Sequence, residues 1–454
     1  MNKVVTAAEI GVSLSTSLCS VEKLQSSLQA KAKSEPSYRF YSLWDKICRE
    51  DVLREAYRRS RANAGAPGVD GIDFEVIETG GVERWLKALQ EELRGKSYAP
   101  QPLLRVWIPK RNGGQRPLSI PVVKDRVVQT AVVLVLGSIF EADLAPQQYG
   151  FRPNLDAKMA IRRVYFHITQ HGRREVVDAD LSDYFTTIPH GPLLRCVSRR
   201  VADGQVLSVI KQWLTLPVWE RKARGVILRT TEARDRKRGT AQGMAASPLL
   251  ANLYFRRFLK AWYEHGHYRR LDAHVVNYAD DLVICCRPGN GAAALETMRR
   301  LMERLSLTVN DRKTRIACVP EQSFDFLGYT VGRFYGKDGR AFIGTEPARK
   351  SVKRIIEKIH DKTTPQWNFD SAENRVAELN ALLRGWSGYF DQGRVIRAYR
   401  VIRKYTERRL RRWLMRRQGK RGTGYRQYSD EHLYETLGLY QLPQSRAAVT
   451  KAKA

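Results

Sequence analysis

Two adjacent carboxylates, Asp280 and Asp281, carry the strongest chemical signal in this sequence. Apolar runs of β type, 274–278 and 282–286, lie on either side of them, and this pattern predicts a hairpin that presents both carboxylates at its turn. Aspartate is also common in turns for conformational reasons alone. The apolar flanks favour a chemical role, because two carboxylates held at a buried hairpin repel one another unless a cation lies between them.

A second acidic site precedes this hairpin in the chain. The apolar residues Val176 and Val177 lead into Asp178 and Asp180, and the i, i+2 spacing of these aspartates places both on one face of a strand. The alternative is a strand that ends in a helix N-cap, with Asp180 or Ser182 as the capping residue. The sequence leaves both interpretations open.

Brought together, the two acidic sites predict a cage for two Mg²⁺ ions, with Mn²⁺ as a substitute. Mg²⁺ prefers oxygen ligands and is commonly held by one or two carboxylates together with substrate phosphates. Two such ions about 3.5–4 Å apart stabilise the attacking and leaving oxygens of phosphoryl transfer. On a basic protein, this cage predicts nucleotidyl transfer or nuclease chemistry.

The composition points to a polyanionic partner. The 454 residues include 79 Lys and Arg against 47 Asp and Glu, a formal charge of +32, and 43% of them are hydrophobic. That apolar fraction excludes wholesale disorder, and the length predicts two to four domains at roughly 100–200 residues each. So large a positive charge favours nucleic acid as the partner, with an anionic membrane surface as the second choice.

The sequence disfavours a membrane or secreted protein. The most apolar run, 127–140, contains Gln129 and is shorter than the roughly 20 residues that a spanning helix needs. The N-terminal residues lack the apolar core of a secretory signal. The six cysteines form no CxxC pair, which is typical of free thiols in a reducing compartment. We therefore expect a cytoplasmic protein with no membrane partner.

Short β-type runs alternate irregularly with helical segments through the centre of the chain, which favours an α+β fold. Residues 1–35 are rich in Ser and Ala, and we expect them to be weakly helical and peripheral. Apolar spacing predicts helices over 36–61 and 82–94, separated by a Gly-rich turn at 65–71. Beyond about residue 349 the chain becomes helix-rich and strongly basic, which marks a domain boundary. The expected β-type runs are 105–109, 175–181, 274–286 and 324–331.

The clearest helix spans residues 394–417. Apolar residues recur on one face at i, i+3/i+4 spacing, and Glu407 is the only acid among many cations. A solvated charged face is the alternative, but the unbalanced charge favours contact with nucleic acid. The cations expected to bind RNA are Arg397, Arg400, Arg403, Lys404, Arg408, Arg411 and Arg412.

An ordered set of motifs from about residue 36 to 440 resembles the group II intron reverse transcriptase/maturase family. The Tyr-x-Asp-Asp hairpin at 278–281 is similar to the family's polymerase motif. Residues 116–121 resemble its fingers motif, and 383–390 resemble its maturase motif. The other matching segments are 239–243 with 247–252, Asn310 with Lys313 and Thr314, and 324–329.

The resemblance implies an α+β right-hand polymerase fold of fingers and palm, followed by an α-helical, basic thumb/maturase domain. The reverse transcriptase domain is expected at roughly 90–330. The implied parts are an N-terminal extension (1–35), N-terminal helices and fingers (36–145), the palm (146–335), the thumb/maturase domain (349–420) and a basic C-terminal tail (421–454).

The resemblance also implies roles for single residues. Asp180, Asp280 and Asp281 are the implied catalytic residues and, with Leu181, the implied metal set. Phe185 matches the aromatic gate that screens the sugar 2′ position, although a core aromatic is the alternative. Lys313 either protonates the leaving pyrophosphate or only pairs with an acid. The residues implied to bind the nucleotide are Lys110, Arg116, Phe185, Gln242 and Lys313.

By this resemblance the protein is an RNA-directed DNA polymerase of the bacterial cytoplasm that uses two Mg²⁺ ions. Its implied partners are an RNA template, a DNA primer, dNTPs and group II intron RNA, whose splicing and mobility it assists; the oligomeric state stays open. Two alternatives stand beside this interpretation. One is an RNA-binding splicing cofactor with little polymerase activity, and the other is a reverse transcriptase co-opted for host defence or a CRISPR system.

The sequence departs from the family pattern at three positions. Ala241 and Met244 replace a proline and a glycine of the Gln-Gly segment, and Ser119 stands where glycine is common in the fingers motif. None of these positions is an expected metal ligand, so activity should survive. No cysteine follows Cys318, so we expect no Cys-rich endonuclease module and no cleavage of target DNA. In the maturase motif, Trp386 is expected to pack within the thumb rather than stack on bases, as is Tyr389.

Overall fold

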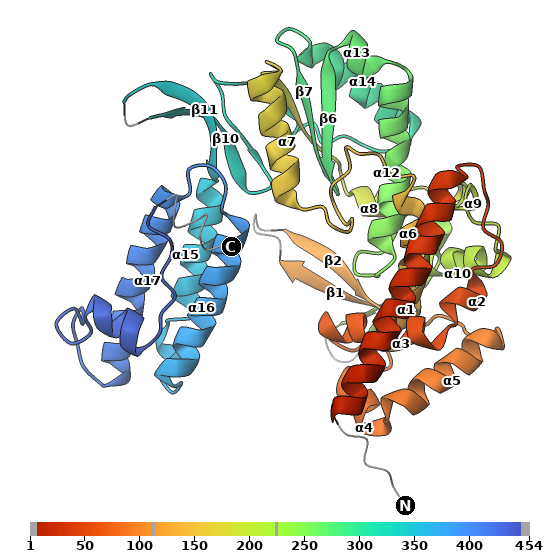
Figure 1. Ribbon diagram of the computed structural model, residues 1–454, viewed down its shortest axis with the longest axis horizontal. Helices are drawn as coiled ribbons and strands as arrows, with labels where there is room; N and C mark the ends of the chain where they lie inside the picture. The colour runs from red at the N-terminus through yellow and green to blue at the C-terminus, as the bar shows by residue number, and fades with distance from the viewer. Residues whose placement is uncertain (1–6, 110–113, 223–225, 337, 446–454) are drawn as a thin grey trace, which may run out of the picture.

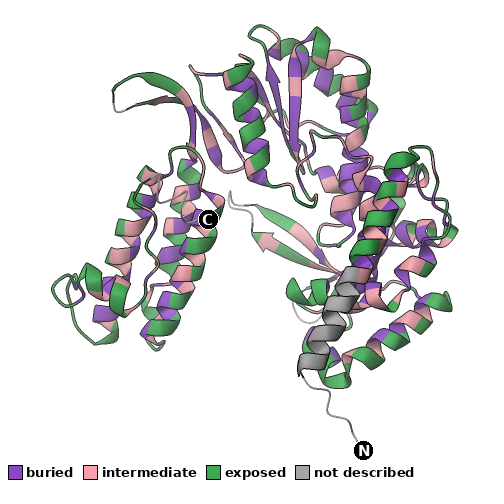
Figure 2. Ribbon diagram, in the orientation of Figure 1, coloured by how far each residue is buried: buried purple, intermediate pink, exposed green. Residues whose placement is uncertain are grey.

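A computed structural model of the chain describes residues 7–109, 114–222, 226–336 and 338–445, with side chains from residue 20 onward. An α+β palm and fingers lie beside a bundle of helices (Figure 1). Buried residues line the inner faces of both parts (Figure 2). The predicted fold class, a right-hand polymerase fold followed by a helical thumb, is confirmed.

The palm is built on an antiparallel sheet of order β6-β7-β3-β8. Its strands are β3 (Glu175–Asp180), β6 (Ala273–Tyr278), β7 (Asp281–Cys286) and β8 (Arg315–Cys318). Successive residues of a strand face opposite sides: Val176 packs against α7 (Ala157–Gln170), whereas Val177 faces the core that contains α12 (Ser247–Glu264) and α14 (Gly291–Arg304). Burial of both faces explains the continuous apolar run of β7.

The fingers carry a second sheet, of order β2-β1-β4-β5. The hairpin of β1 (Leu103–Pro109) and β2 (Gln115–Ile120) forms its first half, with Pro109 opposite Gln115. β1 also pairs in parallel with β4 (Val218–Arg221), which pairs with β5 (Ile227–Thr230). The β-type run expected at 105–109 is therefore the first strand of a hairpin, and the tip of this hairpin lies outside the described residues.

The N-terminal helices pack on α6 (Val123–Glu141), the apolar centre of this half of the molecule. α1 (Ala7–Ser34) lies along α6 (Figure 1); Leu28 is buried, and Gln25 Nε2 donates to the Leu134 carbonyl at 2.8 Å. The expectation that the N-terminal residues are weakly helical and peripheral is therefore wrong for α1. The abundant Ser and Ala make the apolar stripe of α1 narrow, so the sequence pattern did not indicate a packed helix. The neighbouring helices are α2 (Trp44–Ile47), α3 (Glu50–Ala62), α4 (Phe74–Gly80) and α5 (Val82–Arg94).

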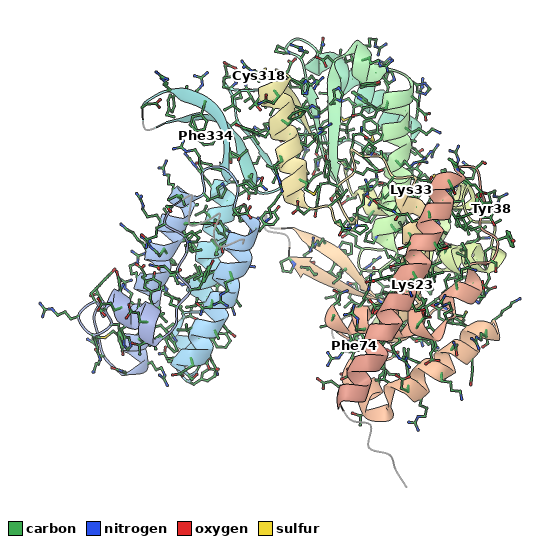
Figure 3. The ribbon with its side chains drawn as sticks, viewed as in Figure 1. Lys23, Lys33, Tyr38, Phe74, Cys318 and Phe334 are labelled. Atoms are coloured by element: carbon green, nitrogen blue, oxygen red, sulfur yellow. The ribbon has the colours of Figure 1, made fainter. Side chains whose placement is uncertain are left out.

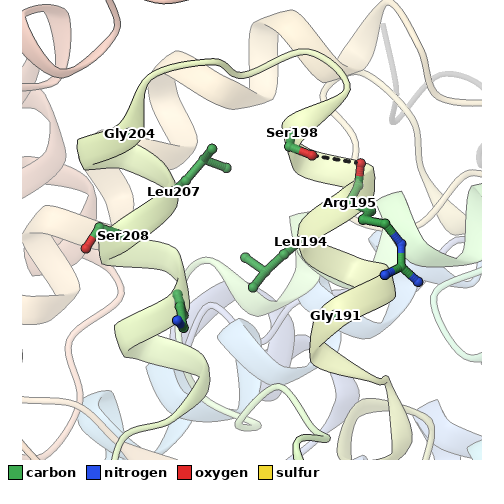
Figure 4. Close-up of a pocket in the computed structure, with 8 residues that line it drawn as sticks. Gly191, Leu194, Arg195, Ser198, Gly204, Leu207 and Ser208 are labelled. Atoms are coloured by element: carbon green, nitrogen blue, oxygen red, sulfur yellow. Dashed lines mark hydrogen bonds between the residues drawn. The ribbon is translucent and has the colours of Figure 1, made fainter.

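An open hollow of about 400 Å³ lies between α9 (His190–Ser198) and α10 (Gly204–Leu214), with Leu194 and Leu207 in its lining (Figure 4).

Among the helices that the structure describes, none combines the length and apolar character that a membrane span requires. The remaining short helices of this half are α8 (Tyr184–Thr187), α11 (Glu232–Arg236) and α13 (His267–Arg270).

The thumb follows a three-stranded sheet of β9 (Phe324–Phe326), β10 (Tyr329–Tyr335) and β11 (Ala341–Pro347). Its helices are α15 (Arg349–Asp361), α16 (Ala372–Tyr389) and α17 (Ile396–Arg417), and they share one apolar core. Residues 425–442, which we expected as part of a basic tail, fold back onto this core instead. The buried residues of this returning segment are Tyr428, Leu433, Leu439 and Leu442.

Candidate active site and nucleic-acid surface

The Tyr-x-Asp-Asp hairpin has the predicted form. β6 ends at Tyr278 and β7 begins at Asp281 directly opposite it, so Asp280 lies in the turn. Asn277 closes the turn from within, because its Nδ2 donates to the carbonyls of Ala279 at 2.8 Å and Asp281 at 3.2 Å. Buried strands thus hold a short turn whose two carboxylate residues are open to solvent.

The second acidic site lies beside this hairpin, on β3. Asp180 is the direct partner of Asp281 in the antiparallel pairing of β3 with β7. Its carboxylate accepts hydrogen bonds from Asn310 Nδ2 at 3.0 Å and from Lys313 Nζ at 3.1 Å. The sheet register therefore brings together the two acidic sites that lie far apart in the sequence.

The N-cap alternative for this second site is wrong. α8 begins after Asp183, and no side chain caps it. Asp180 is instead the last residue of β3, and Asp178 faces the same side of the strand. The Asp178 carboxylate forms an ion pair with Arg315 at 3.5 Å, so it has a partner within the palm.

Burial, together with neighbouring negative charge, raises the pKa values of Asp280 and Asp281. Asp280 and Asp281 touch solvent, but protein surrounds them on most sides. This burial, with the negative charges of Asp280 and Asp180, raises the pKa of Asp281 to about 7. Burial and the charge of Asp180 also raise the pKa of Asp280. A divalent cation relieves such repulsion, so these residues fit the predicted metal.

The backbone of Leu181 also turns toward this site. Leu181 forms an antiparallel bridge with Val309, and the flanking residues make the two hydrogen bonds of that bridge, at 2.8 and 2.9 Å. In such a pair the carbonyl of the central residue points away from its partner. The Leu181 carbonyl is therefore directed to the β7 side of β3, the side on which Asp281 lies.

Comparison with known families assigns two domains to the chain. Residues 108–331 match the reverse transcriptase (RNA-dependent DNA polymerase) family, and residues 352–429 match the maturase-specific domain of group II introns. Protein YkfC of Escherichia coli strain K12 is 32% identical over 399 residues, which cover 80% of this chain and 96% of YkfC. The chain belongs to the group II intron reverse transcriptase/maturase family.

This family membership confirms the resemblance and makes the protein an RNA-directed DNA polymerase that also carries an intron-RNA-binding domain. Reverse transcriptase domains use divalent metal ions, and the partners of both domains are nucleic acids. The group II intron-encoded protein LtrA of Lactococcus lactis subsp. cremoris is 30% identical over 216 residues, which cover 47% of this chain and 34% of LtrA. The match to LtrA thus spans about a third of that protein.

Cations reach the carboxylates of this reverse transcriptase from two directions. Arg116 is exposed on β2, and its positive charge is near enough to lower the pKa of Asp280 against the larger effect of burial. Lys313 approaches from the turn before β8 and pairs with Asp180, which is one of its two predicted roles. Lys110 lies outside the described residues. Two cations, Arg116 and Lys313, therefore lie near the carboxylates.

The Gln-Gly segment packs against the fingers hairpin. Ser119 N donates to the Gln242 carbonyl at 2.7 Å. Gly243 has a φ of 113°, and a Cβ there would lie 2.2 Å from the Ser119 carbonyl oxygen. The departure at Ser119 is tolerated because its backbone makes this contact. Gln242 and Phe185 are half-buried, and their roles toward the nucleotide stay predictions.

The loop at residues 147–150 braces the catalytic turn, and sequence reasoning missed it. Tyr149 N donates to the Asn277 carbonyl at 2.8 Å, and Asn277 N donates to the Gln147 carbonyl at 2.9 Å. Asn252 Nδ2 donates to the Gly150 carbonyl at 2.8 Å. The Tyr-Gly pair before a polar stretch was the available signal, because glycine often marks a close backbone approach.

We expect Gly150→Ala to impair polymerisation. A Cβ at Gly150 would lie 2.4 Å from the backbone nitrogen of Ala279, so the catalytic turn must shift, and a misplacement of about 1 Å can cost about a hundredfold in rate. Gly137→Ala is the matched control, since nothing lies within 4 Å of a Cβ there. Single-turnover primer extension measures both. Wild-type extension rates in Gly150→Ala would show that the turn does not depend on this contact.

The exposed face of α17 carries the predicted cations. Arg403 is half-buried and pairs with Glu407 at 3.6 Å, so part of its charge is neutralised within the helix. The opposite face packs into the thumb core through Tyr399 and Ile402. The exposed cations of the predicted set are Arg397, Arg400, Lys404, Arg408 and Arg412.

Arg411 departs from the prediction, because it is buried. Its side chain is 1% exposed, its Nε donates to the Tyr428 carbonyl at 2.7 Å, and it forms an ion pair with Asp430. The guanidinium also lies 4.4 Å from the ring centroid of Tyr425. The expectation that Arg411 contacts RNA is therefore corrected: this arginine fixes the returning C-terminal segment to α17.

Trp386 of the maturase motif packs within the thumb, as predicted, whereas Tyr389 packs where the thumb meets the sheets. The Trp386 ring lies 4.5 Å, centroid to centroid, from Phe390. Tyr389 Oη donates to the Leu327 carbonyl at 2.8 Å, which ties α16 to the turn between β9 and β10. These contacts fix the thumb to the three-stranded sheet.

Proposed function

We propose that Asp180, Asp280 and Asp281, with the Leu181 carbonyl, hold two Mg²⁺ ions, and that Mn²⁺ can replace them. When bound, such a pair of ions stabilises the attacking and leaving oxygens of nucleotidyl transfer. The proposal is supported by the register that sets Asp180 opposite Asp281 and by the raised pKa of Asp281. Carboxylates that repel one another in this way are suited to a divalent cation.

The remaining residues bind and orient a DNA primer on an RNA template together with a dNTP. Arg116 and Lys110 bind the triphosphate, Gln242 contacts the nucleotide, and Phe185 screens the sugar 2′ position. A bond forms between the primer 3′ oxygen and the α-phosphorus, the proton of the 3′ hydroxyl passes to solvent, and the bond to pyrophosphate breaks. Lys313 donates a proton to the leaving pyrophosphate, which frees this lysine from its ion pair with Asp180.

The observation that carries this function is the meeting of three carboxylates at the ends of β3 and β7. The test is extension of a DNA primer on an RNA template by the purified protein with dNTPs and Mg²⁺. We expect extension that stops when a chelator removes the metal. A protein that binds the primer-template tightly but never extends it would favour the alternative of a splicing cofactor with little polymerase activity.

Mg²⁺ binding should depend on pH. The folded state holds a proton on Asp281 up to about pH 7, whereas the unfolded chain releases it near pH 4. The metal-free fold therefore loses stability as pH rises between these values, and the metal must displace the proton below about pH 7. We expect the Mg²⁺-induced rise in Tm to be larger at about pH 8 than at about pH 6. An equal rise at both pH values, or a difference that persists in Asp281→Asn, would contradict this linkage.

We further propose that the exposed face of α17 binds intron RNA. A variant with glutamine at Arg397, Arg400, Lys404 and Arg408 should bind RNA more weakly, and the slope of log K against log salt should flatten by about 0.7 for each phosphate that the helix no longer binds. A control variant with the same reduction of charge on α5 and its end carries glutamine at Arg84, Lys87, Arg94 and Lys96, which are all exposed. If the α17 variant matches wild type or this control in both affinity and slope, α17 is not the RNA surface.

We also propose that the protein works in the bacterial cytoplasm. The free thiols of the described cysteines support this location: Cys48, Cys196, Cys285, Cys286 and Cys318.

The alternative of a purely RNA-binding role would be favoured if a catalytic carboxylate were missing. All three carboxylates are present.

A further inference from the structure

The β10–β11 hairpin projects from the sheet at the base of the thumb (Figure 1) and carries aromatic side chains that the polymerase site does not use. Phe334 and Phe342 are direct partners across the two strands, and their ring centroids are 6.4 Å apart. Phe342 is 43% exposed. Phe334 beside it is half-buried. An aromatic pair that is partly open to solvent is a candidate binding surface.

The two rings are held in a fixed arrangement by their surroundings. They cover Gly344, where an added Cβ would lie 3.0 Å from each ring, so the bare glycine lets them lie close to the strand. On the opposite face of the hairpin, Tyr165 Oη donates to the Ile343 carbonyl at 3.2 Å. The hairpin is thus braced by α7 on one face and carries the two rings on the other.

An arginine completes this surface. The Arg394 guanidinium lies 5.2 Å from the ring centroid of Phe334 and 5.8 Å from that of Phe342, and Arg394 N donates to the Thr345 carbonyl at 2.8 Å. Arg394 is exposed and stands directly before α17. Phe334 accordingly lies where the hairpin meets the thumb helices (Figure 3). The aromatic pair therefore continues the basic face of α17.

We propose that Phe334, Phe342 and Arg394 form a platform for an unpaired base of a single-stranded RNA segment that runs along α17. The inference deepens the RNA binding proposed for α17 and rests on it. Aromatic side chains bind single strands by stacking on bases, and arginine adds contacts to the backbone phosphates. A duplex offers no free base faces along its length, so the platform favours single strands over paired RNA.

The test compares one RNA oligonucleotide, single-stranded and annealed to its complement, by fluorescence anisotropy over a range of salt. A variant carrying Phe334→Leu and Phe342→Leu keeps apolar side chains but removes both rings. We expect its affinity for the single strand to fall about 5- to 30-fold, with an unchanged salt slope and less than about a twofold effect on the duplex. Phe369→Leu, at an aromatic that is 83% exposed elsewhere in the thumb, should bind like wild type.

A second variant keeps the test decisive if the double replacement unfolds. Arg394→Gln should leave the thermal unfolding curve unchanged and flatten the salt slope for the single strand by about 0.7, the value for one bound phosphate. Equal reductions of affinity for single strand and duplex, or no reduction for either, would overturn the platform. If the α17 variant still weakens binding in that case, the RNA surface stands without the platform. A change in self-association instead of RNA affinity would identify the rings as an interface between copies of this chain and would also overturn the proposal.

Discussion

Asp280→Ala should abolish RNA-templated primer extension while leaving the protein folded. Asp280 lies in an exposed turn between two buried strands, so its loss removes no core packing. It does remove one side of the carboxylate set that holds the metal ions, and the loss of several kcal/mol of transition-state stabilisation lowers the rate by at least about a thousandfold. Single-turnover extension at saturating Mg²⁺ measures the effect.

Asp311→Ala is the matched control for this variant. Asp311 is an exposed aspartate close in sequence to Lys313, and it pairs with Arg299 on the surface. Its removal takes away one negative charge without touching the carboxylate set, so extension should stay near the wild-type rate. If Asp280→Ala extends primers as fast as Asp311→Ala does, the metal site has been assigned to the wrong residues.

Arg411→Ala should lower the stability of the fold, whereas Arg412→Ala, at the neighbouring position, should not. Arg411 is buried, bonded to the Tyr428 carbonyl and paired with Asp430, so its loss should lower the free energy of unfolding by about 2–4 kcal/mol. Arg412 is exposed, so its loss should change stability by less than about 0.5 kcal/mol. Chemical denaturation measures both changes.

RNA binding should show the reverse pattern. Under conditions where both variants are folded, Arg412→Ala should flatten the salt slope by about 0.7, the value for one bound phosphate, and Arg411→Ala should leave the slope unchanged. A flattened slope in Arg411→Ala with normal stability would restore the first expectation for this residue. A loss of stability in both variants would show that Arg412 also supports the fold, which would contradict its assignment to the RNA-binding face.

Local sequence patterns predicted a helix or hairpin correctly where the pattern did not depend on a distant segment of the chain. The helix expected at 82–94 is α5 (Val82–Arg94), and the hairpin around Asp280 is β6 and β7. Both have a regular apolar spacing that needs no distant partner for its interpretation. The approach of Asp180 to Asp281 depends on the pairing of β3 with β7. The sequence predicted it from the shared metal chemistry of two acidic sites and from resemblance to the family, because no local pattern specifies which strands pair.

The predictions failed where a distant segment decides the environment. The spacing of α17 put Arg411 on the charged face, but the segment 425–442 covers that side of its last turns. α1 is diluted with Ser and Ala, and only its packing on α6 shows that its stripe belongs to the core. Gly150 has no chemistry of its own, and its importance follows from the backbone of Ala279 beside it. In each case a tertiary contact overrides the local pattern.

The most direct test of the metal site is an experimental structure of this protein with an RNA template, a DNA primer that lacks its 3′ hydroxyl, a dNTP and Mn²⁺ in place of Mg²⁺. We predict two anomalous peaks about 3.5–4 Å apart, bound by Asp180, Asp280, Asp281 and the Leu181 carbonyl, with the primer end beside them. Metal ions bound away from these carboxylates, or a primer end held elsewhere on the palm, would contradict the proposed mechanism.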